Sequence, residues 1–237
     1  MEATAERTGR RRDRDVVAVR QRELGADRGH KLPAVEAFES FVAIALEAEG
    51  LVVSSGVKFP VRLPTRRKEY EEIQQHGYEV DLVGANAERL VLATVKSYLG
   101  SRGVVTAHVT GETKNEAARK RYTLLNRNEV RKKVAKEAAK LYGYRMSQVE
   151  LRLYVGRFAA PSTGVHEKAI RRWARTQRVG SGPIKVFGLD DVVGQVREAA
   201  SHKQYRDNPV LVTMKVLEAA GMLTETLPDD VGAGVGS

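Results

Sequence analysis

The sequence predicts an α/β fold in which a central mixed β-sheet is flanked by helices. Segments with apolar residues at helical spacing alternate with short segments rich in β-branched and apolar residues, as in layered α/β proteins. The hydrophobic content of 42% over 237 residues is enough to bury the core of one large domain. These segments lie within residues 32–226, so residues 1–31 are interpreted as a basic, flexible arm and residues 227–237 as a disordered tail.

A helix and an irregular strand are predicted at the start of this domain. Apolar residues recur at helical spacing over 33–49, with proline at the start and Gly50 at the end. Residues 51–63 are rich in β-branched and apolar residues but are interrupted by glycine and proline, which favours an irregular strand. Residues 64–77 are polar, so an exposed loop or a short helix is expected there.

A β-hairpin is predicted next. Residues 78–83 alternate between polar and apolar, and residues 89–99 form a second β-rich segment. The linker 84–88 between them favours a turn, which would make the two strands antiparallel neighbours.

The second half of the chain is predicted to supply the remaining layers. After a loop over 100–113, a long helix over 115–142 carries the densest run of lysine and arginine. The later elements are a strand over 150–159, a helix over 165–177, a strand over 184–187, a helix over 189–200 and a C-terminal helix over 209–222.

The charge and composition narrow the function. Lysine and arginine number 40 against 30 aspartate and glutamate, so the net charge of +10 favours a polyanionic partner, with nucleic acid first among them. The absence of cysteine excludes disulfides, thiolate nucleophiles and cysteine zinc sites. The five histidines show no metal-ligand spacing, and neither a phosphate-binding loop nor a dinucleotide fingerprint is present. No segment has the length or apolarity of a membrane helix or a signal peptide, so a cytoplasmic location without membrane contact is expected.

Chemically useful side chains are expected to meet at the hairpin. Side chains two residues apart share one face of a strand, so Glu79 and Asp81 are predicted to project together. Thr94 and Lys96 share a face of the following strand by the same rule. Pairing of the two strands predicts that Asp81, Thr94 and Lys96 converge.

The segments Glu79-Val-Asp-Leu-Val and Ala93-Thr-Val-Lys-Ser-Tyr98 resemble the two half-motifs of the PD-(D/E)XK nuclease superfamily. In that superfamily one strand carries an aspartate, and the next carries an acidic residue, one spacer and a lysine. The similarity covers roughly residues 33–190 and includes the preceding helix and the later strand-helix-strand order. It implies a restriction-endonuclease-like core and a metal-dependent DNA endonuclease that uses Mg²⁺, with Mn²⁺ as a substitute.

The resemblance also implies a role for each motif residue. Asp81 would be the principal metal ligand, and the backbone carbonyl of Val95 would complete part of the metal shell. Lys96 would polarise or help to deprotonate the attacking water and would stabilise charge at the phosphate. Hard cations with carboxylate ligands supply the electrophile that phosphodiester hydrolysis requires.

Thr94 departs from the superfamily pattern, which has an acidic residue at that position. A hydroxyl is a much weaker metal ligand, so three explanations stay open: another acid compensates, the enzyme is weakened, or an inactivating substitution is present. Glu39 is one compensating candidate, because it lies on the apolar stripe of the first helix, where an unpaired carboxylate is costly, and many relatives carry a metal-binding glutamate there. Glu79 is the other, because a hairpin centred near Asn86 would place it opposite Thr94.

Further polar residues are candidates for contacts with double-stranded DNA. They are Ser97, Tyr98, Ser101 and Arg102 after the motif, Arg127 and Arg131 on the long helix, and Arg171 and Arg172 beside Trp173. The alternative interpretation is that these residues, like Asp81 and Lys96, are an ordinary solvated surface.

Three functions therefore remain open. The first is a restriction-type endonuclease, which would cut both strands most simply as a homodimer. The second is a weakened or inactive nuclease-fold protein that binds DNA without cutting it. The third is an RNA-binding structural protein that uses the basic arm and the long helix without a metal.

Overall fold

The computed structural model describes residues 34–64, 73–202 and 208–223. The predicted basic arm over 1–31 and the predicted tail over 227–237 lie outside the described residues. No helix in the described ranges is long and apolar enough to cross a membrane.

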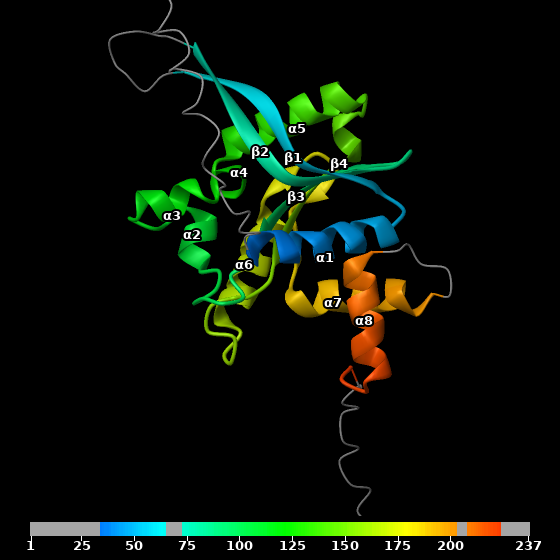
Figure 1. Ribbon diagram of the computed structural model, residues 1–237. Helices are drawn as coiled ribbons and strands as arrows, with labels where there is room; N and C mark the ends of the chain where they lie inside the picture. The colour runs from blue at the N-terminus through cyan, green and yellow to red at the C-terminus, as the bar shows by residue number, and fades with distance from the viewer. Residues whose placement is uncertain (1–33, 65–72, 203–207, 224–237) are drawn as a thin grey trace, which may run out of the picture. The chain divides into compact units, whose positions relative to one another are not determined.

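A five-stranded mixed sheet forms the centre of the unit that follows residue 32, as the sequence predicts (Figure 1). The first and second strands pair antiparallel, as do the second and third, and the last two strands run parallel to the third. In spatial order the strands are β1 (Val52–Pro64), β2 (Ile73–Ala85), β3 (Leu90–Lys96), β4 (Val149–Val155) and β7 (Lys185–Phe187).

Helices cover both faces of the sheet, because the central strand β3 is apolar on both sides. Leu90 and Leu92 pack in one core cluster with residues of α5 (Asn128–Tyr142) and α6 (Val165–Thr176). The alternate residues Val91, Ala93 and Val95 pack in a second cluster on the opposite face. That second cluster contains residues of α1 (Ala34–Ala48), α7 (Leu189–Ser201) and α8 (Pro209–Ala219). The result is a three-layer arrangement of helices, sheet and helices.

The long helix expected over 115–142 is wrong as a single element. Tyr122 and Arg127 have non-helical backbone angles, and the Asn126 side chain bonds the carbonyl of Arg119 across the break. Only the second half is a long helix, α5. The first half, with the expected loop before it, forms the short helices α2 (Thr106–Thr110), α3 (Glu116–Lys120) and α4 (Thr123–Asn126).

The polar segment over 64–77 also differs from expectation. Residues 73–77 belong to β2 and pair with β1 as far as Ile73↔Pro64, because strand pairing outweighs their polar composition. Residues 65–72, which join the two strands, lie outside the described residues. Smaller elements near β4 are the 3₁₀ turn η1 (Met146–Gln148) and the strands β5 (Arg178–Val179) and β6 (Gly182–Pro183).

A switch of faces occurs where β1 carries Gly56 and β2 carries Asp81. These two residues are the one pair missing from an otherwise continuous register, and Gly56 has a φ of 63°. Val80 packs with the α5 side of the core, whereas Leu82 packs with the α1 side, although only one residue lies between them. In a regular strand Val80 and Leu82 would share a face, so the alternation is broken here, because an isolated glycine kinks the strand pair.

The sheet also divides at this point. The pairing of β2 with β3 ends at Leu82↔Ala93, whereas β3 continues along β4 to Lys96↔Val155. Beyond Asp81, β1 and β2 continue as a two-stranded ribbon past the end of β3 (Figure 1).

Candidate functional site

The carboxylate of Asp81 lies where β2 leaves β3, and one of its oxygens receives three donors from β3. The backbone N–H of Val95 donates to Oδ2 at 2.6 Å, and the hydroxyl of Thr94 donates at 3.1 Å. The ammonium group of Lys96 lies 3.4 Å from the same oxygen. The predicted convergence of Asp81, Thr94 and Lys96 is thus present in the structure.

The backbone of Val95 faces this carboxylate for a geometric reason. Gly156 N–H donates to the Lys96 carbonyl at 2.9 Å, so the peptide groups of Lys96 point toward the β4 side. Successive residues of a strand turn their N–H and C=O groups to opposite sides, so those of Val95 point toward Asp81. The carbonyl of Val95 therefore lies on the same side of β3 as the carboxylate.

The Asp81–Lys96 pair is partly buried but still reached by solvent. The exposed fractions of the two side chains are 22% and 18%. In the described part of the chain, all three donors bind Oδ2 and none binds Oδ1. One oxygen thus holds the local structure together, and the other is available to a ligand.

Glu79 does not compensate for Thr94, because the hairpin register differs from the one expected. The turn runs over residues 86–89, with Asn86 N–H bonded to the Arg89 carbonyl at 3.1 Å. In this register Asp81, and not Glu79, is opposite Thr94. Glu79 lies on the exposed ribbon and pairs with Lys58 on β1 at 3.4 Å.

Glu39 is half-buried on α1 between the buried residues Phe38 and Val42. The hydrogen bonds that the carboxylate of Asp81 accepts come from β3. In the three described ranges, no three acidic or histidine side chains lie close enough together to hold a metal ion. A metal site built by three such side chains around Asp81 is therefore absent from the described ranges, and the compensating role of Glu39 stays a prediction.

The donors that are present fit Mg²⁺ only together with a substrate. Asp81 Oδ1 and the Val95 carbonyl are hard oxygen donors on one side of β3. Mg²⁺ retains several waters and is commonly held by one or two carboxylates plus substrate phosphates. One carboxylate and one carbonyl are the minimum for such a site, so tight binding of Mg²⁺ by the free protein is not expected.

The segment after Lys96 is held close to β4 by two glycines. A Cβ on Gly156 would lie 2.4 Å from the Ser97 carbonyl oxygen, and one on Gly103 would lie 2.7 Å from the backbone of Phe158. Between them the chain forms a loop in which Tyr98 has a φ of 47°, unusual for a residue other than glycine. These close approaches fix the loop beside the Asp81 site.

The four DNA-contact candidates in this loop differ in exposure. Ser97 is buried and Tyr98 is half-buried, whereas Ser101 and Arg102 are exposed. The Ser101 hydroxyl donates to the Tyr98 carbonyl at 3.3 Å. Ser101 and Arg102 are therefore accessible beside the site, and Ser97 is not.

Tyr122, which the sequence analysis did not identify, is buried in the core cluster against which Tyr98 of this loop packs. Burial raises the pKa of the Tyr122 phenol above its ordinary value, and a hydrogen bond with the Tyr98 side chain raises it further. Tyr122 stays neutral as a result. Nothing in the residue spacing of the sequence links these two tyrosines.

The four arginine candidates also separate into two groups. Arg131 is buried and donates to the Leu125 carbonyl and to Gln177 Oε1, so it is a structural residue and not a phosphate contact. Arg171 is half-buried and occupied by Glu167 and Asp191. Arg172 is exposed and Arg127 partly exposed, and both remain available.

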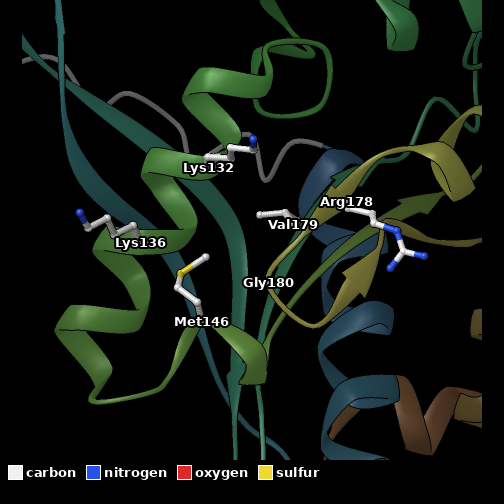
Figure 2. A pocket seen from close by; sticks show the side chains of 6 residues that line it. All are labelled: Lys132, Lys136, Met146, Arg178, Val179 and Gly180. Atoms are coloured by element: carbon white, nitrogen blue, oxygen red, sulfur yellow. The ribbon is translucent and has the colours of Figure 1, made fainter.

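The cavity of about 420 Å³ in Figure 2 lies away from Asp81. It is formed beside α5, η1 and β5, near the start of β4, whereas Lys96 is at the opposite end of β3. Its apolar floor includes Met146 and Val179, and the side chains of Lys136 and Arg178 extend outward from its rim (Figure 2). This cavity therefore has no part in the site.

Comparisons of the chain with family models, with curated proteins and with solved structures found no match.

Proposed function

We propose that this chain is a metal-dependent DNA endonuclease that hydrolyses phosphodiester bonds at Asp81, Val95 and Lys96. The observation that carries the proposal is the meeting of a carboxylate, a backbone carbonyl and an ammonium group at the point where β2 parts from β3. These are three of the groups that the resemblance to PD-(D/E)XK nucleases implies, and the second acidic residue is replaced by Thr94. The element order supports it too: a helix precedes the Asp81 strand, and a strand, helix and strand follow the Lys96 strand.

Each group has a distinct task in this proposal. Asp81 Oδ2 fixes the positions of Val95 and Lys96, and Oδ1 is the oxygen that would bind the metal ion. The Lys96 ammonium group binds a non-bridging oxygen of the phosphate and stabilises the charge that develops there. Bound by Asp81 and Val95, Mg²⁺ would supply a Lewis acid at the phosphate and lower the pKa of a water molecule.

The charge of the surroundings supports an anionic substrate. Arg102 and Ser101 are exposed on the loop that follows Lys96, and the whole chain carries +10. Phosphate contacts of this kind orient a duplex over a site without reading its sequence.

A DNA-binding protein that does not cut is the second candidate function. It is favoured by Thr94, whose hydroxyl donates a hydrogen bond to Asp81 and which provides no second carboxylate. On this alternative, Asp81 and Lys96 are a structural ion pair and the fold serves binding alone.

A cleavage assay separates the two candidates. The wild-type chain is incubated with methylated and unmethylated duplex DNA, with Mg²⁺, with Mn²⁺ or with EDTA, beside a single-stranded RNA of equal length. The endonuclease predicts discrete DNA fragments with either metal and none with EDTA. Duplex binding without cleavage in any metal would establish the second candidate, and preference for RNA would contradict both.

Lys96→Met and Thr94→Glu refine this assay. Lys96→Met keeps the length of the side chain and removes its charge, so cleavage should fall while the fold persists. Thr94→Glu restores the second acid at a buried position, so cleavage that is absent in the wild type and present in this variant would identify a disarmed site.

A further inference from the structure

We propose that the exposed face of the β1–β2 ribbon enters the major groove of the duplex that lies over Asp81. This inference rests on the proposed function and names the element of the chain that contacts the base pairs. The ribbon face is defined by the paired residues Lys58 and Glu79, Pro60 and Gly77, and Arg62 and Gln75.

The two faces of the ribbon differ sharply. Phe59, Val61 and Leu63 are buried in the core cluster that contains the residues of α5. Directly paired residues of an antiparallel ribbon share a face, so the six residues of the ribbon face project to the other side. All six are exposed.

The dimensions of the ribbon suit a DNA groove. The major groove of B-DNA admits a two-stranded β-ribbon, and its base edges offer hydrogen-bond donors and acceptors. In the middle of the ribbon face Pro60 has a short side chain and Gly77 has none, so the backbone can approach the bases closely there. Gln75 is six residues from Asp81, about 20 Å at the usual rise of a strand.

The chemistry of the ribbon face is complementary to DNA. Lys58 and Arg62 are cations spaced along one strand, and Gln75 opposite Arg62 offers both a donor and an acceptor. Glu79 is the one acid on the face, and Lys58 pairs with it at 3.4 Å. The charges thus leave a net positive face beside the site.

The ribbon is also anchored. Lys133 on α5 donates to the Arg62 carbonyl at 2.8 Å, and the buried side of the ribbon packs on the same helix. A ribbon that is already held in place loses less conformational entropy when it binds DNA than a freely moving one.

Gly77 gives a direct test, because a Cβ at Gly77 meets nothing within 4 Å and the fold can accept a side chain there. Gly77→Glu places a carboxylate in the middle of the ribbon face. Gly194→Glu, on α7, is the matched control, because Gly194 is exposed and equally open. Both variants carry the same change in net charge, and thermal unfolding verifies that both are folded.

The binding of each full-length variant to a pool of duplexes with a randomised 20-base-pair stretch is measured at fixed salt. Gly77→Glu should weaken binding about tenfold or more relative to Gly194→Glu, and Gln75→Ala should relax the sequence preference among the bound duplexes. Equal affinity of the two glutamate variants would overturn the ribbon assignment while leaving the nuclease proposal standing. No duplex binding by the wild-type chain would overturn both.

Discussion

The backbone N–H of Val95 on β3 donates to Asp81 Oδ2 on β2 at 2.6 Å, just beyond the last backbone pair of the two strands. The carboxylate takes over an acceptor role that a strand carbonyl would otherwise have. The same contact sets the Val95 carbonyl and the Lys96 side chain beside Asp81. The Asp81 carboxylate thus accepts the free N–H at the strand junction and also brings the Val95 carbonyl and the Lys96 ammonium group together.

Asp81→Asn should therefore show whether Asp81 affects DNA binding without a change in the stability of the fold. An amide of the same shape keeps an acceptor for Val95 N–H, so the melting temperature should change little. Loss of the negative charge removes repulsion toward phosphate, so the affinity for duplex DNA in EDTA should stay equal or rise. Weaker DNA binding by a normally folded Asp81→Asn protein would show that DNA does not lie against Asp81.

The buried ion network of Arg152 should be a principal source of stability. Arg152 is almost fully buried and bonds Glu49, directly after α1, at 2.7 Å and Glu150 on β4 at 2.9 Å. Arg152→Ala leaves Glu49 with Arg89 and Glu150 with Lys185, but it removes the buried guanidinium group and opens a cavity, so it should lower the free energy of unfolding by about 2–5 kcal/mol. The exposed Arg172→Ala should change it by less than about 0.5 kcal/mol. Denaturant titration compares the two.

Glu150 should make the fold sensitive to acid. Burial alone would raise the pKa of Glu150, but hydrogen bonds from Lys185 and Arg152 and the charge of Arg152 bring it below the ordinary value of 4.5. A lowered folded-state pKa stabilises the fold above the unfolded-state pKa, and that contribution is lost as the pH falls below about 4.5.

The acid sensitivity is measured as the denaturant midpoint of the wild type and of Glu150→Gln at neutral pH and at pH values below 4.5. The difference between the two proteins should shrink in acid. Glu129→Gln is the control, because the Glu129–Lys133 pair lies on the surface and is screened by solvent. A constant difference for Glu150→Gln at all pH values would contradict this account.

Gly156 should be required for both stability and activity. Gly156→Ala forces a methyl group toward the Ser97 carbonyl, so it should cost about 1–3 kcal/mol and shift the loop after Lys96. Gly100→Ala in the same loop meets nothing within 4 Å and should be tolerated. Thermal unfolding and cleavage rates compare the two variants, and equal behaviour of both would show that the close approach does not fix the loop.

The order of the main elements was predictable because their apolar periodicity is strong. The first helix, the strands of the mixed sheet and the later helices all appear near their expected positions, and α6 differs by one residue from its expected end. The prediction of one long helix was wrong, although the charge spacing of its first part is helical. The Asn115 side chain begins a separate short helix by accepting the Ala118 N–H, and the Asn126 side chain binds the Arg119 carbonyl where the helix is interrupted. Periodicity does not register such competing bonds.

The convergence of Asp81 with Lys96 was predictable from strand spacing, but its detail was not. The hairpin register depends on the Asn86 side chain, which accepts the N–H groups of Glu88 and Arg89 and so fixes the turn. That register moves Glu79 away from Thr94. The kink at Gly56 had a sequence signal, since an isolated glycine in a strand suggests a bulge. The burial of Arg131 had none, because its partner Gln177 is distant in the chain.

The most direct test of the central claim is the single-turnover rate of duplex cleavage by the wild type and by Asp81→Asn. Both proteins are first saturated with the same DNA in EDTA, and Mg²⁺ is then added. We expect cleavage by the wild type and a loss of at least about 100-fold in Asp81→Asn at equal occupancy, the size expected when a group central to catalysis is removed. Equal cleavage rates for the two bound proteins would contradict the assignment of Asp81 to the chemistry.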